Sequence, residues 1–183
     1  MKIQTHEGHI FDYENLDKNI YDINDIAYSL SRICRFNGHV NQLSFYSVAE
    51  HCYWCSIIAP EGLKLACLLH DAAECYVGDV MRPYKHFLSN KIGHEYAKIE
   101  PSIQKNINSY FELNLTAIDD LNVAEIDNIM LATEYGKCMY RRHDFDWDLP
   151  YQTCEIEPIG FSPEIMTTLF LNRFKGLRIG YIN

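Results

Sequence analysis

The chain contains, at residues 65–74, the stretch LACLLHDAAE, an apolar run that ends in three ionisable side chains. The apolar run predicts a buried helix. His70, Asp71 and Glu74 lie at its polar end, where packing gives no reason for them. An ionisable group in an apolar environment costs several kcal/mol unless it is paired or bound to a metal. We therefore predict a metal site at the end of this helix.

Two further side chains of ligand type, His51 and Asp127, lie on other predicted helices. With His70 and Asp71 they give two imidazoles and two carboxylates. Adjacent residues on a helix point about 100° apart, so His70 and Asp71 reach one ion only if it lies between them. Mixed nitrogen and oxygen ligation suits Mn²⁺, Fe²⁺, Co²⁺, Ni²⁺ or Zn²⁺. The alternative for each residue is an ordinary polar side chain that is satisfied locally.

Helical periodicity and capping residues divide most of the chain into helices. Asp22 or Asn24, Ser47 and Thr116 are suitable N-caps, and Ser162-Pro163 begins the last helix. We predict an all-α fold, a single-domain helical bundle, with an N-terminal arm or short hairpin over residues 1–22. The core covers about residues 23–139, and residues 140–183 form an irregular segment and a terminal helix. The predicted helices cover about residues 23–35, 47–60, 62–76, 91–110, 116–139 and 162–176.

The net charge and composition of the chain argue against some classes of function. The 183 residues carry a net charge of −9, and 48% of them are hydrophobic. An acidic chain does not offer the basic surface that nucleic acids or anionic membranes require. No apolar run approaches a membrane span and no signal peptide is visible, so we expect a cytoplasmic protein. Aromatic residues in the tail make a homo-oligomer plausible.

The seven cysteines are an odd number and lie mostly in apolar helical patterns, which is typical of reduced core residues. Cys52 and Cys55 form a C-x-x-C pair. No second pair accompanies it, so a zinc or redox role for this pair is the weaker interpretation. A structural zinc protein is also disfavoured, because structural zinc sites are usually rich in cysteine.

The ordered motifs of the chain resemble those of the HD-domain metal-dependent phosphohydrolases. Within them, the order is similar to that of small deoxynucleotidases and of phage-type dATP triphosphohydrolases. The resemblance covers about residues 23–139, and the motifs that carry it are Arg35-Phe36-Asn37-Gly38, Tyr46-Ser47-Val48-Ala49-Glu50-His51, Leu68-Leu69-His70-Asp71-Ala72-Ala73-Glu74, Gly78-Asp79 and Pro83-Tyr84-Lys85.

The resemblance implies that His51, His70, Asp71 and Asp127 hold the metal. The resemblance places Glu74 and Asp79 beside the metal as acid/base groups, and it places Arg35, Phe36 and Lys85 around the substrate. Phe36 stands where relatives commonly carry tryptophan, and Ala124 stands where they often carry lysine. The alternatives are a helix-terminal surface cation for Arg35, core packing for Phe36 and a solvated loop position for Lys85.

The same resemblance implies a (deoxy)nucleotide substrate. We expect first a triphosphohydrolase that cleaves dATP to deoxyadenosine and triphosphate, with additional Mg²⁺ accompanying the phosphates. The alternatives are a 5′-deoxynucleotidase that releases phosphate from deoxynucleoside monophosphates, and a non-catalytic nucleotide-binding or regulatory module. The activated water that phosphoester hydrolysis needs is what a bound divalent ion supplies.

Overall fold

Helices α2 (Val48–Ile58) and α3 (Lys64–Leu69) pack against each other at the centre of the fold. The computed structural model describes residues 1–41 and 43–180. Every residue of α3 after Lys64 is buried, as its apolar sequence requires. The remaining elements are β1 (Lys2–Gln4), β2 (Ile10–Asp12), α1 (Ile23–Leu30), α4 (Glu74–Val77), α5 (Arg82–Ile92), α6 (Tyr96–Tyr110), α7 (Ala117–Cys138) and α8 (Pro163–Gly180).

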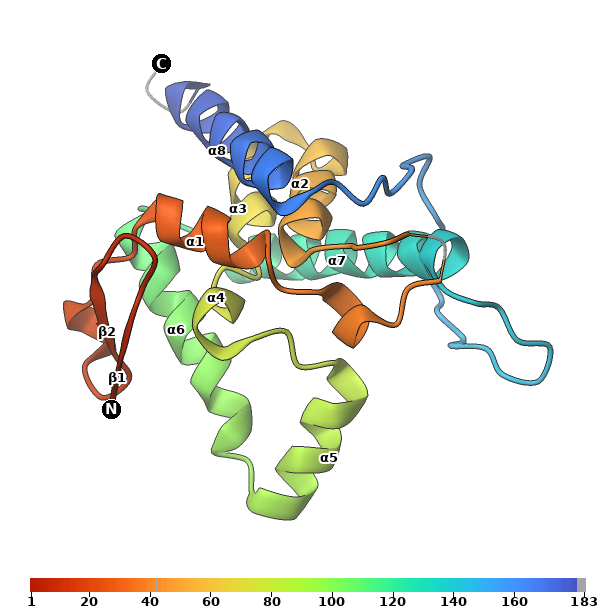
Figure 1. Ribbon diagram of the computed structural model, residues 1–183, viewed down its shortest axis with the longest axis horizontal. Coiled ribbons are helices and arrows are strands. Elements are labelled where there is room, and N and C mark those ends of the chain that lie inside the picture. Colours follow the sequence, from red (N-terminus) through yellow and green to blue (C-terminus); the bar gives the residue numbers. More distant parts are fainter. Residues whose placement is uncertain (42, 181–183) are drawn as a thin grey trace.

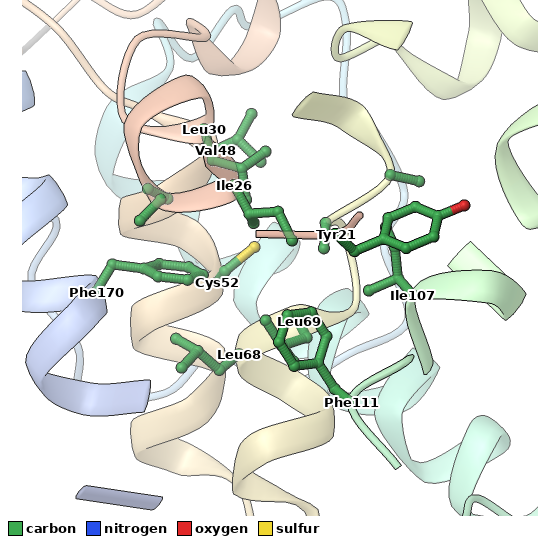
Figure 2. Packing of buried hydrophobic residues seen from close by; sticks show 14 of the residues in the cluster. Tyr21, Ile26, Leu30, Val48, Cys52, Leu68, Leu69, Ile107, Phe111 and Phe170 are labelled. Atoms are coloured by element: carbon green, nitrogen blue, oxygen red, sulfur yellow. The ribbon is translucent and has the colours of Figure 1, made fainter. Parts of the chain in front are cut away.

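The main hydrophobic core lies between α1, α2, α3, α6 and α8, with α8 packed against α1, α2 and α3 (Figure 1). A second, smaller cluster joins α2 and α3 to α7 and contains Cys55, Cys67 and Met130. Side chains from all five helices or their ends meet in the main core (Figure 2), among them Ile26, Leu30, Val48, Cys52, Leu68, Leu69, Ile107, Phe111 and Phe170.

The predicted caps are confirmed. The Asp22 side chain accepts from the Asn24 N–H, and the Ser47 side chain accepts from the Glu50 N–H at 3.1 Å. Thr116 and Asp119 form a reciprocal capping box at the start of α7. The predicted hairpin over the N-terminal residues is also present, as antiparallel β1 and β2. The mostly helical, single-domain fold class is therefore confirmed.

The predicted helix through residues 75–76 is interrupted at the ionisable residues. After Leu69 the backbone changes to i→i−3 hydrogen bonds, in which Ala72 N–H donates to Leu69 O and Glu74 N–H donates to Asp71 O. The carbonyl of Cys67 instead lies 2.8 Å from His70 Nδ1. His70 and Asp71 thus lie in a tight turn between α3 and α4, and not on a continuous helix.

Helix α5 was not predicted, because Pro83 was taken to end helical structure. Proline is tolerated in the first turn of a helix, where its missing N–H would have no partner in any case. Pro83 lies in that position in α5. None of the α5 residues is buried. The helix contacts α6 and projects from the core beside it (Figure 1).

Ser47 and Glu50 have the spacing of a capping box, but the Glu50 side chain binds a distant segment of the chain instead. Its carboxylate is fully buried and accepts backbone N–H bonds from Ile159, Gly160 and Phe161, at 2.7–3.2 Å. This clamp holds the irregular segment against α2 just before α8 begins. Hydrogen bonds to a charged acceptor are among the stronger ones in proteins.

Two further expectations concern the whole chain. All seven cysteines are free thiols, as predicted for reduced core residues. Among the described residues, no helix is both long enough and apolar enough to cross a membrane.

Candidate metal centre and adjoining cleft

Four ligand-type atoms converge where α2, the turn after α3, and α7 meet. His51 Nε2 lies 3.1 Å from Asp127 Oδ1, 3.3 Å from His70 Nε2 and 3.8 Å from Asp71 Oδ2. His70 Nε2 lies 3.3 Å from Asp71 Oδ2 and 3.9 Å from Asp127 Oδ1. The structure therefore brings together all four side chains that the sequence selected as candidate ligands.

Both imidazole rings are held by their other nitrogen. His51 Nδ1 lies 2.6 Å from the Glu134 carboxylate, and His70 Nδ1 lies 2.8 Å from the carbonyl oxygen of Cys67. Because an ionised carboxylate and a carbonyl only accept, each Nδ1 carries the proton and each Nε2 faces the centre. Metal-binding histidines are oriented in this way by carboxylates and carbonyls around them.

The surroundings of the centre favour a positive charge. Two Nε2 atoms that face each other at 3.3 Å repel through their lone pairs unless a proton or a cation lies between them. Burial acts to lower the pKa of His70, but the Asp71 carboxylate beside it holds that pKa well above its usual value. Burial also opposes ionisation of Asp127, yet its contacts with His51 and His70 keep its pKa well below the usual range.

The distances between these donors fit the coordination shell of a small divalent ion. With metal–ligand bonds of about 2.1 Å, neighbouring ligand atoms are about 3.0 Å apart in an octahedron and about 3.4 Å apart in a tetrahedron. The measured donor separations of 3.1–3.9 Å lie in or slightly above this range. The residues present therefore fit a metal ion, with two nitrogen and two oxygen donors.

Two buried thiols lie beside this centre. Cys55 Sγ is 3.6 Å from His51 Nε2, and His51, Cys55 and His70 form one candidate ligand group. Cys52, His70 and Asp71 form another. Burial raises the pKa of Cys52, which opposes the thiolate form that binds metals. We infer that Asp71 is a better partner for His70 than Cys52 is.

A cleft of about 440 Å³ opens beside the candidate ligands. This size lies within the range of pockets that bind small molecules. Its wall contains two of the candidate ligands together with acidic, basic and aromatic side chains. These residues are Arg35, Phe36, Asp71, Glu74, Asp79, Arg82, Lys85, Asp127, Phe145, Asp146 and Trp147, with Val80, Met81, Pro83, Leu131 and Leu149 between them.

Glu74 and Asp79, the predicted acid/base pair, both line the cleft. Glu74 is buried, and its Oε2 has no hydrogen-bond partner among the described residues. Burial, with the negative charges of Asp71 and Asp79, raises the pKa of Glu74 well above its usual value. Burial also raises the pKa of Asp79. Carboxyl groups with raised pKa values can hold and release protons near neutral pH.

The predicted substrate-binding residues line the same cleft, but two of them are already engaged. Arg35 is buried and donates from Nε to Glu134 at 2.9 Å, so it is not a surface cation. The Lys85 ammonium lies 2.7 Å and 2.9 Å from the two carboxylate oxygens of Glu100. Phe36 is buried and contacts Trp147 edge-on, with 5.9 Å between ring centroids.

Phe36 also has an unusual backbone conformation. Its φ is 56°, and the next residue, Asn37, has φ 51°. A bulky residue in the left-handed region is strained, and such strain is concentrated at functional sites. The Phe36 ring lies in the wall of the cleft. Trp147 in turn stacks on Tyr135, with a centroid separation of 4.6 Å.

Glu134, Tyr46 and Arg82 contribute to the site but were not among the predicted site residues. The Glu134 carboxylate is fully buried and accepts from three side chains, including the Tyr46 hydroxyl at 2.8 Å. Glu134 follows Asp127 by seven residues, or about two helical turns, so both lie on one face of α7. That seven-residue spacing was the feature of the sequence that could have indicated a role for Glu134. The ordered motifs gave no signal for Arg82, whose Nη2 lies 3.3 Å from Asp127 Oδ2.

No protein-family model matches the chain. The uncharacterized protein YfdR of Escherichia coli K12 is 39% identical over 132 residues, which are 72% of this chain and 69% of YfdR. An uncharacterized protein of Rhodobacter capsulatus is 33% identical over 103 residues, 50% of this chain and 48% of that protein. A 5′-deoxynucleotidase of Erwinia tasmaniensis is 25% identical over 134 residues, 69% of this chain and 58% of that enzyme.

Proposed function

The chain belongs to the HD-domain phosphohydrolase family, and we propose that it is a metal-dependent hydrolase of deoxynucleotide phosphoesters. One observation carries the proposal: His51 Nε2 and His70 Nε2 lie 3.1–3.9 Å from each other and from carboxylate oxygens of Asp71 and Asp127, beside a cleft that also contains Glu74 and Asp79. We assign the metal-ligand role to the first four residues. Their donor set fits Mn²⁺, Fe²⁺, Co²⁺, Ni²⁺ or Zn²⁺.

The chemistry divides between the ion and the side chains around it. A divalent ion held by this set would activate a water molecule and withdraw charge from a phosphoryl oxygen. Glu74 holds a proton on its buried carboxyl group and gives it to the leaving oxygen of the nucleotide. Asp79, which is less buried, accepts the proton of the attacking water. Arg35 holds the carboxylates in place and adds positive charge to the cleft wall.

We propose a deoxynucleoside monophosphate as the first substrate to test. The relative from Erwinia tasmaniensis is a 5′-deoxynucleotidase, which supports this alternative over the dATP triphosphohydrolase expected from the motifs. Phe36 and Trp147 offer aromatic faces on which a base can stack. Stacking on aromatic faces accepts every base, so these two residues do not define a base preference.

Product analysis tests the proposal. Protein loaded with Mn²⁺ or Co²⁺ would be incubated with deoxynucleoside monophosphates, deoxynucleoside triphosphates and ribonucleotides, and products resolved by chromatography and phosphorus NMR. Orthophosphate from the monophosphates is the expected result. Triphosphate and deoxyadenosine from dATP would favour the alternative activity. Stabilisation by nucleotides without turnover would instead favour a binding module.

Replacing one ligand tests the site itself. Asp71→Asn should abolish both metal binding and turnover, because it removes the charge of one of the two ligand carboxylates. Asp144→Asn is the matched control, since Asp144 is exposed and pairs with Arg142 outside the cleft. Full activity of Asp71→Asn with any of the five metals would refute the assignment of this residue.

A further inference from the structure

The three cations of the cleft differ in how firmly carboxylates hold them. The Arg35 guanidinium is buried, donates to Glu134, and lies 3.8 Å from Asp71 and 3.7 Å from Asp127. Lys85 is held by both carboxylate oxygens of Glu100. Neither side chain can turn towards a substrate without leaving a carboxylate unpaired in a partly buried site.

Arg82 is held more weakly. It begins α5 and reaches across to α7, where Nη1 donates to the side-chain oxygen of Asn128 at 3.0 Å. Its other terminal nitrogen lies 3.3 Å from Asp127 Oδ2, and the side chain is 56% exposed. An ion pair with this exposure contributes at most about 1 kcal/mol. Arg82 can therefore exchange these partners for a stronger anion at a small cost in free energy.

The position of Arg82 relates it directly to the candidate metal centre. Asp127 directs Oδ1 towards His51 Nε2, while its other oxygen, Oδ2, faces Arg82. The guanidinium is thus separated from the four converging ligand atoms by a single carboxylate group. An anionic group bound next to these atoms in the cleft would lie within reach of the Arg82 fork.

We propose that Arg82 is the residue that binds the phosphate group to be cleaved, by exchanging Asn128 and Asp127 Oδ2 for phosphate oxygens. The inference rests on the proposed function, because it places the phosphate beside the metal ligands. Arginine suits this role because its planar fork binds two phosphate oxygens at once. The exchange also releases Asp127 Oδ2 from Arg82 while the substrate is bound.

The experiment measures binding of inorganic phosphate to the metal-loaded protein, by phosphorus NMR titration, for wild type, Arg82→Gln and Arg82→Lys. Arg82→Gln keeps one NH₂ donor, so loss of about one charge-assisted hydrogen bond should weaken phosphate binding by about 10- to 100-fold. Arg82→Lys should recover part of this loss, since it keeps the charge without the fork. Arg142→Gln, in an exposed arginine outside the cleft, is the matched control and should bind phosphate as wild type does.

A metal titration of the same variants separates the possible outcomes. Weaker phosphate binding by Arg82→Gln with unchanged metal affinity supports the proposal. Unchanged phosphate binding would overturn it, and a loss of metal affinity alone would make Arg82 only a support for Asp127. Because this readout needs no turnover, an inactive wild type that still binds phosphate through Arg82 would refute the proposed function and leave the phosphate site standing.

Discussion

The Glu134 carboxylate is the group whose replacement most directly tests how the centre is built. It accepts from His51 Nδ1 at 2.6 Å, from the Tyr46 hydroxyl at 2.8 Å and from Arg35 Nε at 2.9 Å. Glu134→Gln keeps the shape but turns one acceptor oxygen into an NH₂ donor. If the NH₂ faces Arg35, two donors oppose each other. If it faces His51, the ring must accept at Nδ1 and carry its proton on Nε2, which removes the ligand lone pair.

Two magnitudes follow from this geometry. Removal of one partner of a buried ion pair costs about 3–5 kcal/mol, because the other charge is left uncompensated. Asp71 and Asp127 remain 3.8 Å and 3.7 Å from Arg35, so we expect Glu134→Gln to lower the free energy of unfolding by about 3 kcal/mol, the lower end of that range. Loss of a carboxylate that orients a metal-binding histidine weakens metal affinity by about 10- to 100-fold.

The assay combines urea denaturation with metal titration against a chromophoric chelator. Tyr46→Phe is the control, because it removes one bond to Glu134 and leaves the bond from His51 Nδ1. It should cost about 1.5 kcal/mol of stability without changing metal affinity. Glu134→Asp, which keeps the charge but shortens the reach, serves if Glu134→Gln does not fold. Wild-type metal affinity in both Glu134 variants would refute the idea that this carboxylate orients His51.

Two further predictions concern the segment that leads into α8. Glu50→Gln weakens the acceptor of the N–H bonds that hold this segment and should lower the free energy of unfolding in urea by about 3 kcal/mol; a change below about 0.5 kcal/mol would contradict the clamp. Gly160→Ala should lower Tm by the equivalent of about 2 kcal/mol or more, because φ is +74° and the new methyl group would lie 2.6 Å from Phe45 O. Gly176→Ala, where a methyl group meets nothing within 4 Å, should instead gain up to about 1 kcal/mol. Shifts of the same sign in both glycine variants would show that the close approach at Gly160 does not decide its effect.

The sequence was sufficient for the helical fold and for the His70-Asp71 pair because both depend on local patterns, whereas His51 and Asp127 were joined to the pair through the resemblance to a known family. Capping residues such as Ser47 and Thr116 define helix starts, and an ionisable pair after an apolar run is rare enough to indicate a site. The local patterns gave a wrong prediction where one residue type is compatible with two opposite structures. Pro83 can end a helix or occupy its first turn, and only the chain around it decides between these outcomes.

The rest of the site depends on contacts between distant parts of the chain. A glutamate within a helix is usually exposed, so the position of Glu134 two turns after Asp127 was not enough to distinguish a buried acceptor from a solvated side chain. Its three donors come from residues 83–99 positions away in the sequence. The same holds for Arg82, whose partners on α7 are 45 and 46 positions away. Local sequence thus indicates His70 and Asp71, whereas the orientation of the candidate ligands and the charge that faces the cleft arise only when α2, α5 and α7 are brought together. For this reason, substitutions at Glu134 and Arg82 test the assembled centre more sharply than substitutions of the ligands do.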